Sequence, residues 1–86
     1  MAKPQVVYIV LYGHKHGTDC WVTSTEGKAQ ASIGGTIKQY IDDVPMERDR
    51  KRIRYHLKAG RIMQAANIWV DIMEEWFEIN PRTVDT

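Results

Sequence analysis

Seven consecutive apolar residues, 6–12 (VVYIVLY), constrain the fold more than any other stretch of the sequence. They are rich in β-branched and aromatic side chains and follow Pro4, a pattern typical of a strand. Because side chains alternate along a strand, Val7, Ile9 and Leu11 lie on one face and the other apolar residues on the opposite face. Both faces are apolar, so we expect both to be at least partly covered.

A second, shorter strand is predicted over residues 19–25 (DCWVTST). The residues between the strands, 13–18, have the length of a hairpin connection, and Gly17 can take the positive φ of a bulged turn. Cys20 then lies on one face of the sheet and Trp21 on the other. A two-stranded sheet has two open edges, so we expect the chain's tail, a second copy or a partner strand to complete it.

Three helices are predicted after the hairpin, over residues 25–43, 45–60 and 61–79, from apolar residues at three- and four-residue steps. The third has the widest apolar face, so Trp69 and Trp76 are predicted to be core residues. The predicted fold class is α+β, an N-terminal β-hairpin followed by three α-helices (ββααα), with the helices packed on one face of the small sheet.

The length of 86 residues corresponds to one compact domain, 1–86, with residues 80–86 predicted to form a flexible tail. One cysteine, Cys20, cannot form an internal disulfide, which favours a reducing compartment. No stretch reaches the roughly 20 apolar residues that a membrane span needs. We therefore expect a cytoplasmic protein that does not bind membranes.

The hairpin connection holds the most suggestive cluster of polar residues, with His14 and His16 two positions apart. Two histidines at this spacing on a strand share a face and can chelate Zn²⁺, with Asp19 and Cys20 as two further ligands. The competing interpretation is an ordinary solvated turn, because Gly17 in a bulge would separate the two rings. We take the turn as the main interpretation and metal binding as an alternative.

The segment 9–20 superficially resembles the His-x-His-x-Asp-His ligand segment of metallo-β-lactamases, which also follows an apolar strand. It departs from that segment because Thr18 displaces the aspartate, Cys20 replaces the final histidine, and only His56 remains elsewhere. The nearness of Cys20 to the two histidines also fits a thiol nucleophile with its base. No oxyanion-hole loop accompanies them, so we expect no enzymatic activity and no cofactor.

The spacing of Gly60, Ile62, Ala65 and Trp69 resembles the start of the second helix of a tetratricopeptide repeat. Ile62 stands where that family has an aromatic residue. Such repeats need at least three stacked copies, and this chain has one. The resemblance implies only a tight helical hairpin.

Charge is unevenly distributed although the net charge is only +1. Residues 46–61 hold seven basic and two acidic residues, whereas residues 62–86 hold one basic and five acidic residues. If the second and third helices fold back at Gly60, these charges pair across the hairpin. The expected partners are Arg48, Lys51 and Arg52 on one helix and Asp71, Glu74 and Glu75 on the other.

The basic stripe of the second helix supports nucleic-acid binding as an alternative function. Residues three or four positions apart on a helix can follow phosphates, and a tyrosine beside them can stack on a base. The residues assigned to this alternative are Lys51, Arg54, Tyr55, Lys58 and Arg61. The expected internal pairing leaves few free charges, which makes it the weaker hypothesis.

The leading hypothesis is a small non-enzymatic protein–protein interaction module, either a homodimer or docked on a larger protein. Its basis is the incomplete sheet, the abundance of Trp and Tyr, and the separate charged patches. Small proteins of this kind are common in bacteriophages and mobile elements, so the most specific form of the hypothesis is an inhibitor or accessory protein that binds a host protein. The predicted contact residues are Tyr8, Tyr12, His14, Lys15, His16 and Trp21.

Overall fold

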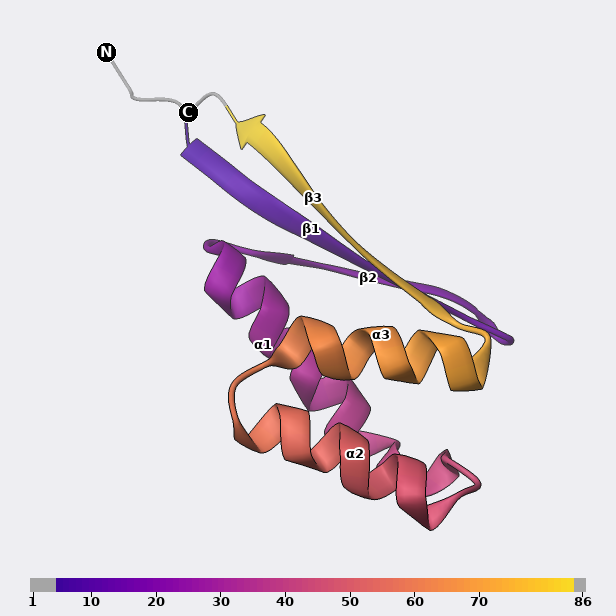
Figure 1. Cartoon of the computed structure of the whole chain (residues 1–86). Coiled ribbons are helices and arrows are strands. Elements are labelled where there is room, and N and C mark those ends of the chain that lie inside the picture. The colour runs from indigo at the N-terminus through magenta and orange to yellow at the C-terminus, as the bar shows by residue number, and fades with distance from the viewer. Residues whose placement is uncertain (1–4, 85–86) are drawn as a thin grey trace.

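The computed structural model describes residues 5–84, which form a three-stranded antiparallel sheet with helices on one side of it (Figure 1). The elements are β1 (Gln5–His14), β2 (Gly17–Thr23), α1 (Glu26–Gln39), the short 3₁₀ helix η1 (Ile41–Asp43), α2 (Glu47–Lys58), α3 (Ile62–Met73) and β3 (Trp76–Val84). The predicted α+β class and the hairpin are confirmed, although the second strand covers residues 17–23 rather than 19–25 and α2 packs on α3 rather than on the sheet. The order ββααα is wrong, because the described chain ends in a strand.

The C-terminal strand forms where the sequence predicted helix and then tail. Helix α3 ends at Met73, and Glu74 takes a left-handed conformation with φ 56° and ψ 39° that turns the chain back. Residues 76–84 then pair with β1 along its length, and the sheet order is β2-β1-β3. The helix predicted over 61–79 is therefore too long, and residues 80–84 of the predicted tail belong to β3; residues 85–86 lie outside the described residues.

Two periodicities overlap in this segment, which explains the error. Trp69, Met73 and Trp76 follow one another at helical steps, but Phe77 and Ile79 also alternate with polar neighbours, as in a strand. Tertiary pairing decides between them, because β3 satisfies the backbone groups along the free edge of β1. One of the three expected ways of completing the sheet, the C-terminal segment of the chain, is thus the one observed.

The hydrophobic core lies between the sheet and helices α1 and α3. Val10 and Tyr12 of β1 point into it, and Trp69 of α3 is its largest fully buried side chain, with 1% exposed. Helix α2 packs on α3 and forms an outer layer away from the sheet (Figure 1). The core residues are Val10, Tyr12, Ala29, Ile33, Ile37, Ile41, Val44, Ile53, Ala65, Ala66 and Trp69.

Local signals set the boundaries of several elements. The hairpin turns at residues 15–16, and Gly17 has the predicted positive φ, at 132°. The side chain of Thr25 caps α1 by accepting a hydrogen bond from the Lys28 backbone N–H at 3.1 Å. Gly60, with φ 80°, follows the end of α2, as the sequence predicted. None of the helices within residues 5–84 is long and apolar enough to cross a membrane.

Trp76 is the exception among the predicted core tryptophans. It is 46% exposed and lies on the side of the sheet away from the helices, opposite Gly13 in the β1–β3 register. A Cβ atom on Gly13 would come within 2.0 Å of Trp76 Cε2. Glycine at this position therefore allows the indole to lie against the β1 backbone, as aromatic residues do over glycines in sheets.

We expect Gly13→Ala to push the Trp76 indole off the sheet and to lower the free energy of unfolding by about 1–3 kcal/mol, the usual cost of overpacking. The measurement is chemical denaturation followed by tryptophan fluorescence. In a Trp76→Ala background the same substitution has no indole to displace, so it should be neutral or stabilising. An equal loss of stability in both backgrounds would contradict this contact.

Candidate functional site

A hollow of about 540 Å³ lies beside the tip of the β1–β2 hairpin, between the sheet and the ends of the helices. We call it the tip hollow. Four of the six predicted contact residues line it, namely Tyr12, His14, Lys15 and His16. Its other lining residues are Asp19, Tyr40, Asp43, Trp69, Met73 and Glu75.

The Glu75 carboxylate joins two of the side chains that line the tip hollow. Its Oε1 atom accepts hydrogen bonds from the Tyr12 hydroxyl at 2.5 Å and from Trp69 Nε1 at 2.8 Å. Tyr12 also stacks on Phe77, with ring centroids 4.7 Å apart. The carboxylate thus connects β1, α3 and the start of β3. Sequence reasoning missed this role of Glu75, because its two partners lie 63 and 6 positions away.

Burial of the Tyr12 side chain and its hydrogen bond to the Glu75 carboxylate raise the pKa of the Tyr12 phenol. The hydroxyl therefore stays protonated and keeps donating to Glu75 throughout the neutral range. A phenol held in this way contributes to the stability of the fold and is poorly suited to act as a base.

His14 is engaged on both ring nitrogens. Its Nε2 lies 3.1 Å from Asp19 Oδ2, and its Nδ1 accepts a hydrogen bond from the backbone N–H of His16 at 3.2 Å. This pattern places the proton of a neutral His14 ring on Nε2, where it is donated to Asp19. The hairpin tip is therefore bound together by its own polar groups.

The four residues of the metal-binding alternative do not converge. Asp19 lies opposite Tyr12 in the β1–β2 register and shares its face, whereas Cys20 lies opposite Leu11 and points to the other side of the sheet. Within residues 5–84, no group of three or more His, Cys, Asp and Glu side chains is arranged to hold a metal ion. The same separation keeps the Cys20 thiol from the His14 ring.

The remaining two predicted contact residues, Tyr8 and Trp21, lie on the helix-covered face of the sheet. Both are partly buried and pack against the core. The Trp21 Nε1 atom is buried and has no hydrogen-bond partner among the described residues. These side chains are less available to a partner than the residues of the tip hollow.

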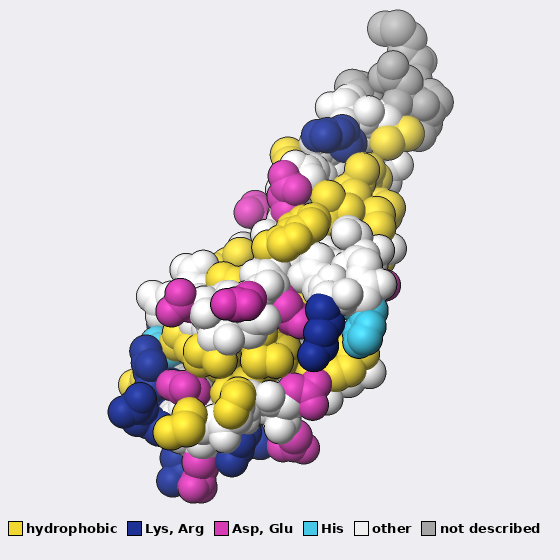
Figure 2. Space-filling view, turned by 90° about the vertical axis from the view of Figure 1, so that its right-hand side faces the viewer, with side chains coloured by type: hydrophobic (Ala, Val, Ile, Leu, Met, Phe, Trp, Pro, Cys, Tyr) yellow, Lys and Arg dark blue, Asp and Glu magenta, His cyan; other side chains and the backbone are white. Residues whose placement is uncertain are grey.

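The basic side chains of α2 find partners nearby rather than on α3. The pairs join Lys51 to Glu47 at 3.7 Å, Arg52 to Asp49 at 3.5 Å and Arg54 to Asp42 at 3.7 Å. None of the ion pairs among residues 5–84 joins α2 to Asp71, Glu74 or Glu75, so the predicted pairs are wrong. One reason is that α3 ends at Met73, which places the two glutamates in the connection to β3. Figure 2 shows basic and acidic side chains intermingled over the helical end of the molecule.

Tyr55 and Arg61, also assigned to nucleic-acid binding, contact each other. The Arg61 guanidinium lies 5.1 Å from the centroid of the Tyr55 ring, and its Nε donates a hydrogen bond to His56 Nδ1 at 3.1 Å. Of the five assigned residues, Lys58 alone makes no ion pair or cation–π contact within residues 5–84. Lys51 and Arg54 lie in exposed, water-screened pairs, so the alternative keeps Lys58 as its one cation without a described partner and two that are weakly paired.

The side of the sheet that carries Val7, Ile9 and Leu11 departs from the expectation that both faces of β1 are covered, because no described helix lies over it (Figure 1). We call it the open sheet face. Three of its apolar side chains are well exposed, Val22 at 60%, Trp76 at 46% and Val84 at 42%, and Figure 2 shows hydrophobic side chains gathered over the sheet. Its residues are Gln5, Val7, Ile9, Leu11 and Gly13 of β1, Thr18, Cys20 and Val22 of β2, and Trp76, Glu78, Asn80, Arg82 and Val84 of β3.

Comparison of the chain with protein-family models, curated proteins and solved structures gives no match. The function must therefore be inferred from the surfaces of the chain itself.

The Tyr12–Glu75 hydrogen bond predicts a specific pH dependence of stability. Because the pKa of the Tyr12 phenol is raised in the folded state, the phenol adds to the free energy of unfolding. This contribution is complete below pH 10, the ordinary tyrosine pKa, and is lost as the pH rises further. Tyr12→Phe should lower the free energy of unfolding by about 1–2 kcal/mol at pH 7. It should also flatten the fall in stability above pH 10, measured by urea denaturation.

Tyr55→Phe is the matched control, because the Tyr55 side chain is exposed and lies away from Glu75. If Tyr12→Phe and the wild type lost stability in parallel from pH 9 to 11, the assigned role of the Tyr12 phenol would be refuted.

Proposed function

We propose that this chain is a non-enzymatic protein-interaction module that works as a homodimer, with the open sheet face as the contact surface. The observation that carries the proposal is the pattern of side chains on this face, which is self-complementary under a two-fold rotation. Three apolar side chains of this face, Val22, Trp76 and Val84, are also at least 42% exposed.

The strand register arranges the outward side chains in rows about 7 Å apart, the distance spanned by two residues of a strand. The central row holds Ile9, flanked by Val22 and Asn80. Toward the hairpin tip, the next row holds Cys20, Leu11 and Glu78, and the outermost row holds Thr18, Gly13 and Trp76. Toward the other end of β1, the next row holds Val7 and Arg82, and the outermost row holds Gln5 and Val84.

A two-fold axis along the central row, perpendicular to the strands, stacks each strand on its own copy in the opposite direction. Ile9 then meets Ile9 of the second copy at the centre. The other facing pairs are Leu11 with Val7, Glu78 with Arg82, and Trp76 with Val84. Each apolar side chain in these pairs meets an apolar one, and each charge meets its opposite.

A different axis does not give this match. If the axis ran parallel to the strands, β3 would stack on β2, and Glu78 would face Cys20 of the second copy. Neither Glu78 nor Arg82 forms an ion pair with any residue between 5 and 84, so both are available to a partner. Charge complementarity therefore selects the perpendicular axis.

The size of the face sets the expected affinity. Three strands about 4.8 Å apart, each with about nine residues of 3.3 Å rise, give a face of roughly 400 Å². Two copies then bury roughly 800 Å² in total, which is below the roughly 1,200 Å² at the lower end of stable specific interfaces and in the range of weak, transient ones. We expect a reversible dimer in the micromolar range rather than a permanent one.

The internal bonds of the tip hollow support a non-enzymatic role. Glu75 accepts hydrogen bonds from Tyr12 and Trp69, and His14 is bonded to Asp19. The Cys20 thiol lies on the opposite face of the sheet. No candidate nucleophile is left beside a free base among the residues singled out from the sequence. The phage-type inhibitor role and the cytoplasmic location stay predictions from the sequence.

The dimer can be tested by reversing charges on the open sheet face. Glu78→Arg and Arg82→Glu should each weaken self-association at least tenfold in sedimentation equilibrium, because each places like charges opposite one another. An equimolar mixture of the two variants should associate again as a heterodimer, since their charges are then complementary. The double variant Glu78→Arg/Arg82→Glu should dimerise like the wild type.

Lys51→Glu serves as the control, because Lys51 is an exposed residue of α2 on the far side of the helical layer. It should leave the dimer intact. A wild-type chain that stays monomeric at several hundred micromolar would overturn the homodimer, as would charge reversals that have no effect.

A further inference from the structure

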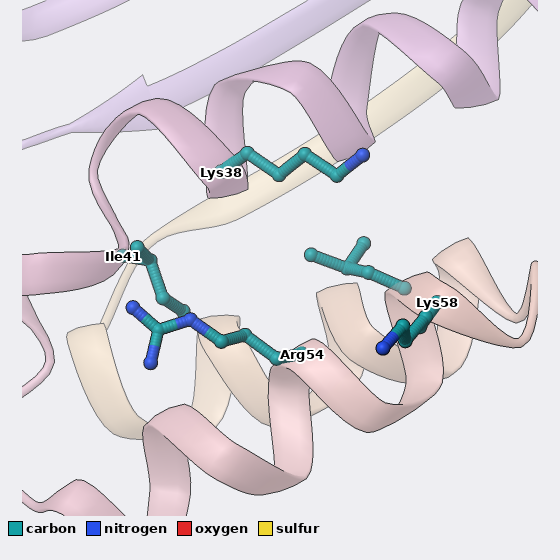
Figure 3. Close-up of a pocket in the computed structure, with 5 residues that line it drawn as sticks. Lys38, Ile41, Arg54 and Lys58 are labelled. Atoms are coloured by element: carbon teal, nitrogen blue, oxygen red, sulfur yellow. The ribbon is translucent and has the colours of Figure 1, made fainter.

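A groove of about 390 Å³ lies between α1 and α2, away from the open sheet face. It is lined by Lys38, Ile41, Arg54, Leu57 and Lys58. Figure 3 shows Lys38 reaching out from the end of α1 while Arg54 and Lys58 extend from α2, with Ile41 pointing toward Arg54. Cationic side chains from two helices thus border one concave surface. We call it the cationic groove.

The floor and walls of the cationic groove are apolar. Ile41 is buried and Leu57 is partly buried, and both pack with the hydrophobic core. The hydrocarbon stems of the lysines and of Arg54 add further apolar surface below their charged ends. The result is a groove open to solvent on one side, whose apolar floor and few charged groups are features that small-molecule sites share.

The charges at the rim are only weakly compensated. Arg54 lies 3.7 Å from Asp42, but the Asp42 side chain is 93% exposed, so water screens this pair. Lys38 and Lys58 form no ion pair with any described residue. Both lysines also lie in the last turn of a helix and offset its dipole, a role that does not require an apolar floor between them.

We propose that the cationic groove binds a small amphipathic anion, a hydrocarbon or aromatic body that carries one carboxylate or phosphate group. The apolar body lies on Ile41 and Leu57, and the anionic group meets Lys38 or Lys58, the two cations at the rim that form no ion pair with a described residue. A nucleic acid fits less well, because it needs a line of cations along its phosphates. On α2, Lys51, Arg52 and Arg54 each lie within 3.7 Å of an acidic side chain, and Arg61 contacts Tyr55, so the helix offers no unbroken line of cations.

The test is an NMR titration of the ¹⁵N-labelled full chain with octanoate and with octyl phosphate, two probes that share the apolar body but differ in the anion. We expect saturable shifts centred on residues 37–41 and 54–58. Octanol, octylammonium and inorganic phosphate should each bind at least tenfold more weakly than octyl phosphate. If octanol bound as tightly as octyl phosphate, the charge of the groove would play no part in binding. If inorganic phosphate bound as tightly as octyl phosphate, the apolar floor would play no part. Either result overturns the proposal.

Variants locate the site. Lys38→Gln/Lys58→Gln should weaken both anionic probes about tenfold or more, whereas Lys28→Gln, an exposed lysine near the opposite end of α1, should change nothing. If the two variants behave alike, the probes bind elsewhere and the proposal fails. It also fails if a short oligonucleotide binds more tightly than octyl phosphate and depends on Lys38 and Lys58. The charge reversals of β3 should not affect this binding, so the cationic groove is tested independently of the dimer.

Discussion

The antiparallel pairing of β3 with β1 is the constraint on which the rest of the structure depends. It turns a marginal two-stranded hairpin into a three-stranded sheet, with β1 bonded on both edges. It also requires the chain to leave α3 at Met73 and to turn at Glu74, which brings the Glu75 carboxylate to Tyr12 and Trp69. The sheet, the core and the tip hollow are therefore fixed by one set of strand contacts.

The sequence predicts those parts of the fold that short-range chemistry controls. The apolar run of β1, the turn at Gly17 and the helical break at Gly60 were all predicted, because each rests on alternation or on a positive φ that glycine favours. β3 was not predicted, since its residues also satisfy a helical spacing and the left-handed turn falls on Glu74 rather than on a glycine. The pairing of β3 with β1 decides between helix and strand for these residues, because their local pattern fits both.

The same distinction applies to the surfaces. The sequence predicts a solvated turn at the two histidines and assigns both to partner contact, and the structure places them beside the tip hollow. Glu75 could not be assigned, because its partners Tyr12 and Trp69 come from two different elements, β1 and α3. The part of the open sheet face that β3 supplies could not be foreseen, because a helix and then a tail are predicted over those residues. Once Trp76, Glu78 and Arg82 are known to lie in a strand, their alternation places them on the open sheet face, on which the proposed dimer rests.

The central claim, that two copies stack through the open sheet face, is tested most directly by isotope-filtered NOE measurements. A 1:1 mixture of ¹³C-labelled and unlabelled chains should show intermolecular contacts from Ile9 to Ile9, from Val22 to Val22 and from Leu11 to Val7. Intermolecular contacts that come instead from α1 or α2, or none at millimolar concentration, would contradict the account.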